Sequence, residues 1–171
     1  MFNKICRRIA IAGVILALVS VSALAQGGAA NFSFRAINGE PVSSESLRGE
    51  VVVLAFGASW LPLTRNQMEA VKKLADQYAG RGVAVYWVST ESESPKSKNY
   101  VSDEQLRELA RKYKVTVLRD PDGVVSKRLG VDQLPSVVII DKQGSVTATI
   151  GGMDPQANLA TQLAARLDKI L

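Results

Sequence analysis

Short apolar runs alternate along this chain with longer stretches in which apolar residues recur every three or four positions. A continuous apolar run of strand length fits a strand that is buried on both faces of a sheet, and residues 51–56 are the clearest case. The turn sequences Asn38-Gly39 and 141–144 predict a β-hairpin near each end of the folded region. The predicted strands are residues 31–34, 51–56, 83–88, 116–119, 137–140 and 146–150.

Helices are predicted between these strands. In residues 62–80, apolar side chains recur at spacings of three and four and form one stripe. A capping box at Ser102 begins a second helix, and Asp154-Pro155, a cap followed by a first-turn proline, begins the last one. The polar segment 89–99 is predicted to be a solvated loop. The helical segments are the single turn 43–47 and helices at 62–80, 102–113, 124–129 and from 155 onward.

The order of these elements predicts the fold class. A β-hairpin is followed by alternating strands and helices, and a second hairpin and a helix close the chain. This order indicates an α/β protein with a mixed central β-sheet, helices on both faces and an N-terminal β-hairpin. The length of 171 residues suggests one domain, which we place at residues 31–171.

The first residues have the pattern of a secretion signal. Three basic residues precede the uncharged stretch 9–24, and Ala23-Leu24-Ala25 fits the small-x-small rule for cleavage. We therefore expect a signal peptide at residues 1–25, a flexible lead-in at residues 26–30, and export to the periplasm or cell envelope. The alternative is that residues 9–25 remain as a membrane anchor, because their length is at the lower limit for spanning a bilayer.

Charge and composition exclude several kinds of site. The signal carries three basic residues and no acidic one, so its removal lowers the net charge from +5 to +2. The remaining basic residues do not form the clustered footprint of a nucleic-acid-binding protein. Cys6, the one cysteine, lies in the signal, and the chain has no histidine. The carboxylates are scattered, so we expect no metal, no disulfide and no cofactor.

Several landmarks follow one another in a specific order. Strand 51–56 leads into Phe56-Gly57-Ala58-Ser59-Trp60, Asp120-Pro121-Asp122-Gly123 comes later, and Leu134-Pro135 precedes strand 137–140. Over residues 31–171 this order resembles the thioredoxin-like fold, and more closely the exported TlpA-like thiol–disulfide oxidoreductases, or redoxins. In ordinary members the resemblance implies a Trp-Cys-x-x-Cys turn at the start of a helix.

The active-site positions implied by this resemblance are vacated. The two cysteines would stand at Leu61 and Thr64, and the acidic residue that commonly follows three positions later would stand at Gln67. Leucine has nothing to ionise, threonine cannot form a disulfide, and glutamine cannot exchange a proton near neutral pH. Thr64 is not expected to act as a nucleophile, because no histidine is present to activate it. Gln67 is expected to be solvated or half-buried.

The peptide groove of the family is the part expected to survive. By resemblance, the Leu134–Pro135 bond is expected to be cis, with Pro135 facing the turn and the neighbouring backbone pairing with an extended segment. The expected groove residues are Trp60, Leu61, Pro62, Leu134 and Pro135. Leu61 is expected to be exposed or half-exposed. Two roles stay open for Trp60, which either contacts the groove or caps the core.

A fold retained without its redox residues predicts a redox-inactive protein. We expect a non-catalytic module of the cell envelope that binds a protein or peptide partner, with a membrane involved only if the signal is retained. The alternative is an oxidoreductase or antioxidant-type redoxin that acts through a bound cofactor or a partner's thiols. A third hypothesis is a structural domain whose groove is closed by its own side chains.

Overall fold

The computed structural model describes residues 29–154 and 156–171. The predicted signal peptide, residues 1–25, and the first part of the predicted lead-in lie outside the described residues. Ala30 is buried, and its N–H donates to the carbonyl oxygen of Gly144 at 2.7 Å. None of the helices in the described part of the chain has the length and apolar character needed to span a bilayer.

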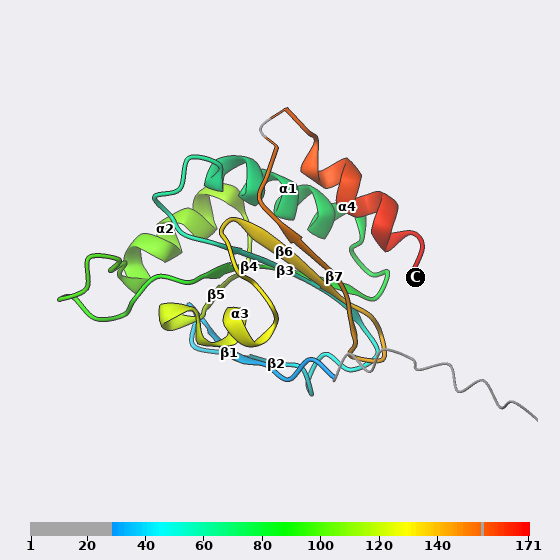
Figure 1. The fold of residues 1–171 in the computed structure, drawn as a ribbon, viewed down its shortest axis with the longest axis horizontal. Helices are drawn as coiled ribbons and strands as arrows, with labels where there is room; N and C mark the ends of the chain where they lie inside the picture. Colours follow the sequence, from blue (N-terminus) through cyan, green and yellow to red (C-terminus); the bar gives the residue numbers. More distant parts are fainter. Residues whose placement is uncertain (1–28, 155) are drawn as a thin grey trace, which may run out of the picture.

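The described residues form one mixed sheet of seven strands, in the order β2-β1-β5-β4-β3-β6-β7 (Figure 1). β4 runs parallel to both of its neighbours, and all other neighbouring pairs are antiparallel. β1 and β2 form the predicted N-terminal hairpin. The strands are β1 (Ser33–Ala36), β2 (Pro41–Ser43), β3 (Val51–Gly57), β4 (Val83–Ser89), β5 (Val117–Arg119), β6 (Ser136–Ile140) and β7 (Val146–Gly151).

Helices cover both faces of this sheet. α1 (Thr64–Gln77), α2 (Asp103–Tyr113) and α4 (Leu159–Leu167) lie on one face (Figure 1). The short α3 (Val124–Arg128), preceded by the 3-10 turn η1 (Pro121–Gly123), lies on the other. The predicted α/β class, with a mixed sheet flanked by helices on both faces, is confirmed.

Two apolar clusters pack against the two faces of β3. Every residue of this strand is buried, as its uninterrupted apolar run predicts. Alternate side chains of a strand point to opposite faces. The odd-numbered side chains from Val51 to Ala55 therefore join the cluster that contains α1 and α4 residues, and the even-numbered ones join the cluster that contains Phe32 and Phe34. This burial fits an interior strand, and β3 lies between β4 and β6 in the sheet. Its carboxyl end leads through a short turn into α1.

The last helix begins later than predicted. Asp154, the expected cap, accepts the N–H of Gln156 at 2.9 Å in a separate turn. α4 begins at Leu159, because the side chain of Asn158 accepts the N–H of Thr161 at 3.1 Å. An asparagine in this position satisfies a backbone donor that the helix itself cannot.

Candidate functional site

The turn between β3 and α1 meets the loop that leads into β6 at one end of the sheet. Trp60 and Leu61 from the turn and Leu134 from the loop line a depression of about 530 Å³. The structure thus brings together three of the five predicted groove residues. The other two do not line the depression, since Pro62 is exposed beside it and Pro135 is buried.

The loop before β6 is held by two hydrogen bonds to its backbone carbonyl groups. Its Leu134–Pro135 peptide bond is cis, as the sequence predicts. The N–H of Gly152 donates to the carbonyl oxygen of Pro135 at 3.0 Å, and the hydroxyl of Ser136 donates to the carbonyl oxygen of Gln133 at 2.6 Å. Leu134 is left 37% exposed at the rim of the depression.

Trp60 faces solvent and does not cap the core. Its side chain is 66% exposed, which excludes one of the two roles left open by the sequence. The indole Nε1–H donates to Oδ1 of Asn99 at 2.8 Å, so the polar edge of the ring is satisfied within the protein. The apolar faces of a ring held in this way remain available for contact.

A buried carboxylate holds the residue just before Trp60. Glu91 is 1% exposed and accepts hydrogen bonds from the backbone N–H of Ser59 at 2.9 Å and from its hydroxyl at 2.6 Å. The hydroxyl of Ser89 donates to the same carboxylate at 3.0 Å. Hydrogen bonds to an ionised acceptor are stronger than neutral ones. Glu91 therefore anchors the beginning of the turn that presents Trp60.

The prediction of a solvated loop at residues 89–99 is wrong for its first part. Ser89 ends β4, and Thr90, Glu91 and Ser92 are buried. Polar composition predicted exposure, but these polar groups can be buried because they find hydrogen-bond partners. Sequence reasoning could not identify Ser59 as the hydrogen-bond partner of Glu91, because the two residues are far apart in the sequence.

We call residues 90–101 the strap. The N–H of Ser92 donates to the carbonyl oxygen of Asn99 at 2.7 Å, and the N–H of Val101 donates to that of Ser92 at 3.2 Å. These bonds close the strap on itself. Through Glu91 and Asn99, the strap contacts two successive residues of the turn.

Four charged groups fasten the outer part of the strap. The side chain of Arg119 is 1% exposed. Its Nη1 donates a hydrogen bond to the carbonyl oxygen of Val101 at 3.1 Å, and its Nε lies 3.3 Å from Oε1 of Glu93. Arg35 reaches Glu93 at 2.6 Å and Asp103 at 2.9 Å. The hydrogen bond from Arg35 holds the pKa of Asp103 below its ordinary value. We call these four residues the clasp, and their two positive and two negative charges balance.

Leu61 and Thr64, the two positions where the resemblance implies cysteines, lie in the turn and at the first residue of α1. α1 begins at Thr64 rather than at Pro62, so Leu61 lies before the helix and is half-buried, as predicted. The N–H of Thr64 donates to the carbonyl oxygen of Leu61 at 3.1 Å. The Thr64 side chain is buried, and its hydroxyl donates to the carbonyl oxygen of Ala58 at 2.5 Å. A hydroxyl used in this way is a structural donor, which agrees with the exclusion of Thr64 as a nucleophile.

The expected exposure of Gln67 is wrong. Its side chain is 0% exposed; Nε2 donates to the carbonyl oxygens of Phe56 at 3.1 Å and Ser136 at 3.2 Å, and Oε1 accepts from Nε1 of Trp87 at 2.8 Å. The amide therefore ties β3, β4 and β6 together beneath the turn. The signal was present in the sequence, because Gln67 lies four residues before Val71 on the apolar stripe of the helix.

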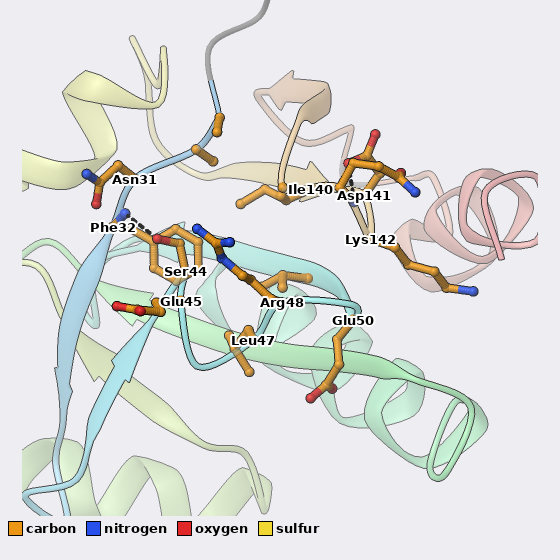
Figure 2. A pocket seen from close by; sticks show the side chains of 15 residues that line it. Asn31, Phe32, Ser44, Glu45, Leu47, Arg48, Glu50, Ile140, Asp141 and Lys142 are labelled. Carbon is orange, nitrogen blue, oxygen red and sulfur yellow. Dashed lines mark hydrogen bonds between the residues drawn. The ribbon is translucent and has the colours of Figure 1, made fainter.

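A second depression, of about 590 Å³, lies at the opposite end of the sheet, beside the first residue of β3 (Figure 2). Arg48 and Lys142 line it together with Glu45, Glu50 and Asp141, so its charge is mixed. None of the predicted site residues lies there. In residues 29–154 and 156–171, no group of three or more histidine, cysteine, aspartate or glutamate residues is placed to hold a metal ion.

Comparisons with known proteins agree with this architecture. The model of the AhpC/TSA family matches residues 26–149. Thioredoxin-like protein YneN of Bacillus subtilis is 31% identical over 122 residues, which cover 69% of this chain and 66% of the relative. The thiol-disulfide oxidoreductase ResA of Bacillus thuringiensis is 27% identical over 135 residues, 79% of this chain and 74% of the relative.

Among solved structures, the pneumococcal exposed lipoprotein thioredoxin Etrx1 of Streptococcus pneumoniae matches with a TM-score of 0.63 and 25% identity. The match covers 81% of this chain and 99% of that protein. The chain therefore belongs to the AhpC/TSA family, as a thioredoxin-like, TlpA-like member whose sequence lacks the two cysteines of a Cys-x-x-Cys turn.

Proposed function

We propose that this protein is a non-catalytic binding module of the cell envelope, which holds an extended segment of a partner protein in the depression beside Trp60. Five large apolar side chains are substantially exposed among the described residues. Trp60 and Leu134 line the depression, and Tyr100 and Val124 directly follow the lining residues Asn99 and Gly123. The fifth, Leu171, is the last residue of the chain. This gathering of apolar surface around one depression carries the proposal.

The shape of the partner segment follows from the two walls of the depression. One wall is the turn that carries Trp60 and Leu61, and the other is the loop that carries Leu134. The family resemblance assigns the backbone of this loop to pairing with an extended segment. An extended chain can pair through its backbone while alternate side chains contact the apolar walls.

The proposed lack of thiol redox chemistry rests on the residues present in the sequence. Cys6 is the one cysteine, so residues 7–171 hold no thiol, and Thr64 and Gln67 are committed to hydrogen bonds within the core. Export is part of the proposal and rests on the pattern of residues 1–25. It accords with Etrx1, which is described as an exposed lipoprotein. Retention of residues 9–25 as an anchor would keep the binding module at a membrane.

The binding role can be tested with the exposed apolar residues themselves. Tagged protein and its Trp60→Ala and Leu134→Ala variants are cross-linked in the native envelope, purified and compared by mass spectrometry. A partner captured by the wild type should be lost from both variants. Leu171→Ala, which also removes an exposed leucine, is the matched control and should capture the partner as the wild type does. Equal capture by all four proteins would contradict the proposed site.

An insulin-reduction assay tests the non-catalytic part separately. The purified protein should give no rate above the background set by dithiothreitol alone. Clear turnover would contradict the proposal and favour an oxidoreductase that uses a bound cofactor or a partner's thiols. A visible absorption spectrum of protein purified from its native envelope then separates these two cases, because haem and flavin absorb above 300 nm whereas thiols do not.

A further inference from the structure

The two edges of the sheet differ in how they are protected. β2, at one edge, is three residues long and begins with Pro41, which has no N–H to offer. β7, at the other edge, is six residues long and contains neither proline nor a charged residue. Proteins usually protect edge strands by shortness, proline or charge, since an open edge pairs readily with another chain. β7 has none of these three protections, and the one irregularity of its pairing with β6 is a register shift between Ile139 and Ile140. β7 lies at the edge of the sheet (Figure 1).

The outward hydrogen-bonding groups of β7 can be identified from its register. Ile150 lies opposite Val137, and Ala148 lies opposite Ile139. The bond from the N–H of Gly152 to Pro135 shows that even-numbered residues here face β6. In an antiparallel pair the alternate residues point the other way, so Thr149 and Gly151 direct their N–H and C=O groups away from the sheet. Both residues are exposed.

A depression of about 580 Å³ runs beside this edge, on the face covered by α4. One side of its lining comes from β6 and β7 and is apolar except for one threonine, and the other side comes from α4 and the residues just after it. The strands contribute Ile139, Thr147, Ala148 and Ile150, and the helix side contributes Gln162, Ala165, Arg166, Lys169 and Ile170.

The helix side of this depression is positively charged. Arg166 and Lys169 are both exposed, and no acidic residue lines the depression. None of the ion pairs found among the described residues includes either of them. A strand added at the edge would bring alternate side chains beneath these two cations. Acidic side chains would be attracted there and basic ones repelled.

The same charges argue against a second copy of this chain as the added strand. If the β7 strands of two copies paired around a two-fold axis, both α4 helices would lie on the same face of the joined sheet, next to the β7–β7 interface. Arg166 and Lys169 of one copy would then face the same residues of the other. Like charges placed together in an interface disfavour association.

We propose that β7 accepts an extended acidic segment of a partner protein as an eighth strand. Its apolar side chains contact Ala148 and Ile150, and its carboxylates pair with Arg166 and Lys169. The backbone of Thr149 and Gly151 supplies the hydrogen bonds. This site is separate from the depression beside Trp60 and does not depend on the function proposed there.

A designed peptide tests the proposal directly. The probe is a blocked nine-residue peptide in which threonine alternates with valine and glutamate, and the control peptide has lysine in place of glutamate. Protein expressed from the full-length sequence and isotope-labelled is titrated with each peptide and followed by amide hydrogen exchange. The acidic peptide should slow exchange at Thr149 and Gly151. The lysine peptide should bind at least about tenfold more weakly than the acidic peptide.

Two variants separate backbone pairing from charge pairing. Thr149→Pro removes the outward N–H and should abolish binding, whereas Thr149→Val keeps the N–H and should retain it. Arg166→Glu combined with Lys169→Glu should weaken binding of the acidic peptide by about tenfold and strengthen binding of the lysine peptide. Lys73→Glu, on the exposed side of α1, is the charge control and should change neither. The charge variants remain informative if Thr149→Pro does not fold.

Three results would overturn the proposal. The first is unchanged exchange at Thr149 and Gly151 in the presence of millimolar acidic peptide. The second is equal binding of the acidic and lysine peptides. The third is self-association of the chain, measured by analytical ultracentrifugation without peptide and abolished by Thr149→Pro, which would assign the edge to a second copy.

Discussion

Two buried polar side chains, Gln67 and Glu91, support the same turn from different directions and in different ways. Gln67 lies beneath the turn, is uncharged, and uses both amide hydrogens and its oxygen within the sheet. Glu91 lies on the strap, carries a carboxylate, and accepts hydrogen bonds from Ser59 and Ser89. Both are 1% exposed or less. Gln67 therefore supports the turn through an uncharged amide, and Glu91 supports it through a carboxylate that acts as an anchor.

The difference follows from the hydrogen-bond partners that each side chain meets. A carboxyl at position 67 would face two carbonyl oxygens, Phe56 O and Ser136 O, which need donors. The amide meets this need without ionising. Glu91 faces donors only, so an ionised carboxylate suits it. The surroundings of each position therefore match the side chain that occupies it.

Gln67→Glu should have the largest effect. An ionised carboxylate would face two carbonyl oxygens in a fully buried site, and we expect it to lower the free energy of unfolding by about 3 kcal/mol or more at neutral pH. Gln67→Met, of similar shape and without charge, is the control. Urea unfolding followed by far-UV circular dichroism measures both variants against the wild type.

The pH dependence separates charge from lost hydrogen bonds in that experiment. Burial beside carbonyl oxygens raises the folded-state pKa of the introduced carboxyl above its unfolded value of about 4.3. The loss of stability should therefore be smallest below about pH 4 and grow as the pH rises, by at most about 1.4 kcal/mol per pH unit. The methionine variant should show no such growth. Parallel behaviour of the two variants would mean that the introduced carboxyl escapes to solvent.

Glu91→Ala should have the next largest effect. It leaves the N–H of Ser59 and two serine hydroxyls without their acceptor in a buried site, which should cost about 2 kcal/mol of stability. Glu91→Gln keeps one acceptor oxygen and should cost less. The fluorescence anisotropy of Trp60, measured with Trp87→Phe as background, should fall in Glu91→Ala because the turn loosens. An unchanged anisotropy would show that Asn99 alone holds the indole.

Leu61→Cys with Thr64→Cys tests the turn that lies between the two supports. The two residues are joined by a hydrogen bond from the N–H of Thr64 to the carbonyl of Leu61 at 3.1 Å, so their side chains start close together. We expect an intramolecular disulfide under mild oxidation, counted by thiol titration. The cross-link closes a short loop and should stabilise the oxidised form by about 2 kcal/mol at most. Two thiols that stay free would show that the turn no longer has the geometry of a Cys-x-x-Cys site.

Asp103→Asn should have the smallest effect, because it loosens the strap from its outer side. Ion pairs near the surface contribute little, and we expect a loss of about 0.5 kcal/mol at neutral pH. The folded-state pKa of Asp103 is lowered by Arg35, so its contribution is present above the unfolded pKa of about 3.9 and disappears as the pH falls below it. Urea midpoints at neutral and acidic pH measure this. Glu108→Gln, on the same helix and outside the clasp, should show no such difference.

The depression beside Trp60 shows how far the sequence could lead. Trp60, Leu61 and Leu134 were predicted to lie together and do, because the strand–turn–helix order and the Leu134-Pro135 landmark place them at one end of the sheet. Pro62 and Pro135 were predicted to line the same groove and do not. A resemblance assigns residues to a neighbourhood, but whether each one faces the depression depends on local backbone direction.

The sequence by itself determined the fold class and the buried interior strand β3, and the family resemblance of its landmarks implied the cis bond at Pro135 and the loss of the redox cysteines. Apolar periodicity and turn residues act between near neighbours, so they can be recognised in the chain. Only the tertiary structure decided which hydrogen-bond partners Gln67 meets, that Glu91 anchors Ser59, and that Arg119 is enclosed in the clasp. Polar and charged residues are predicted to be exposed unless partners are known, and the partners of these three come from distant parts of the sequence.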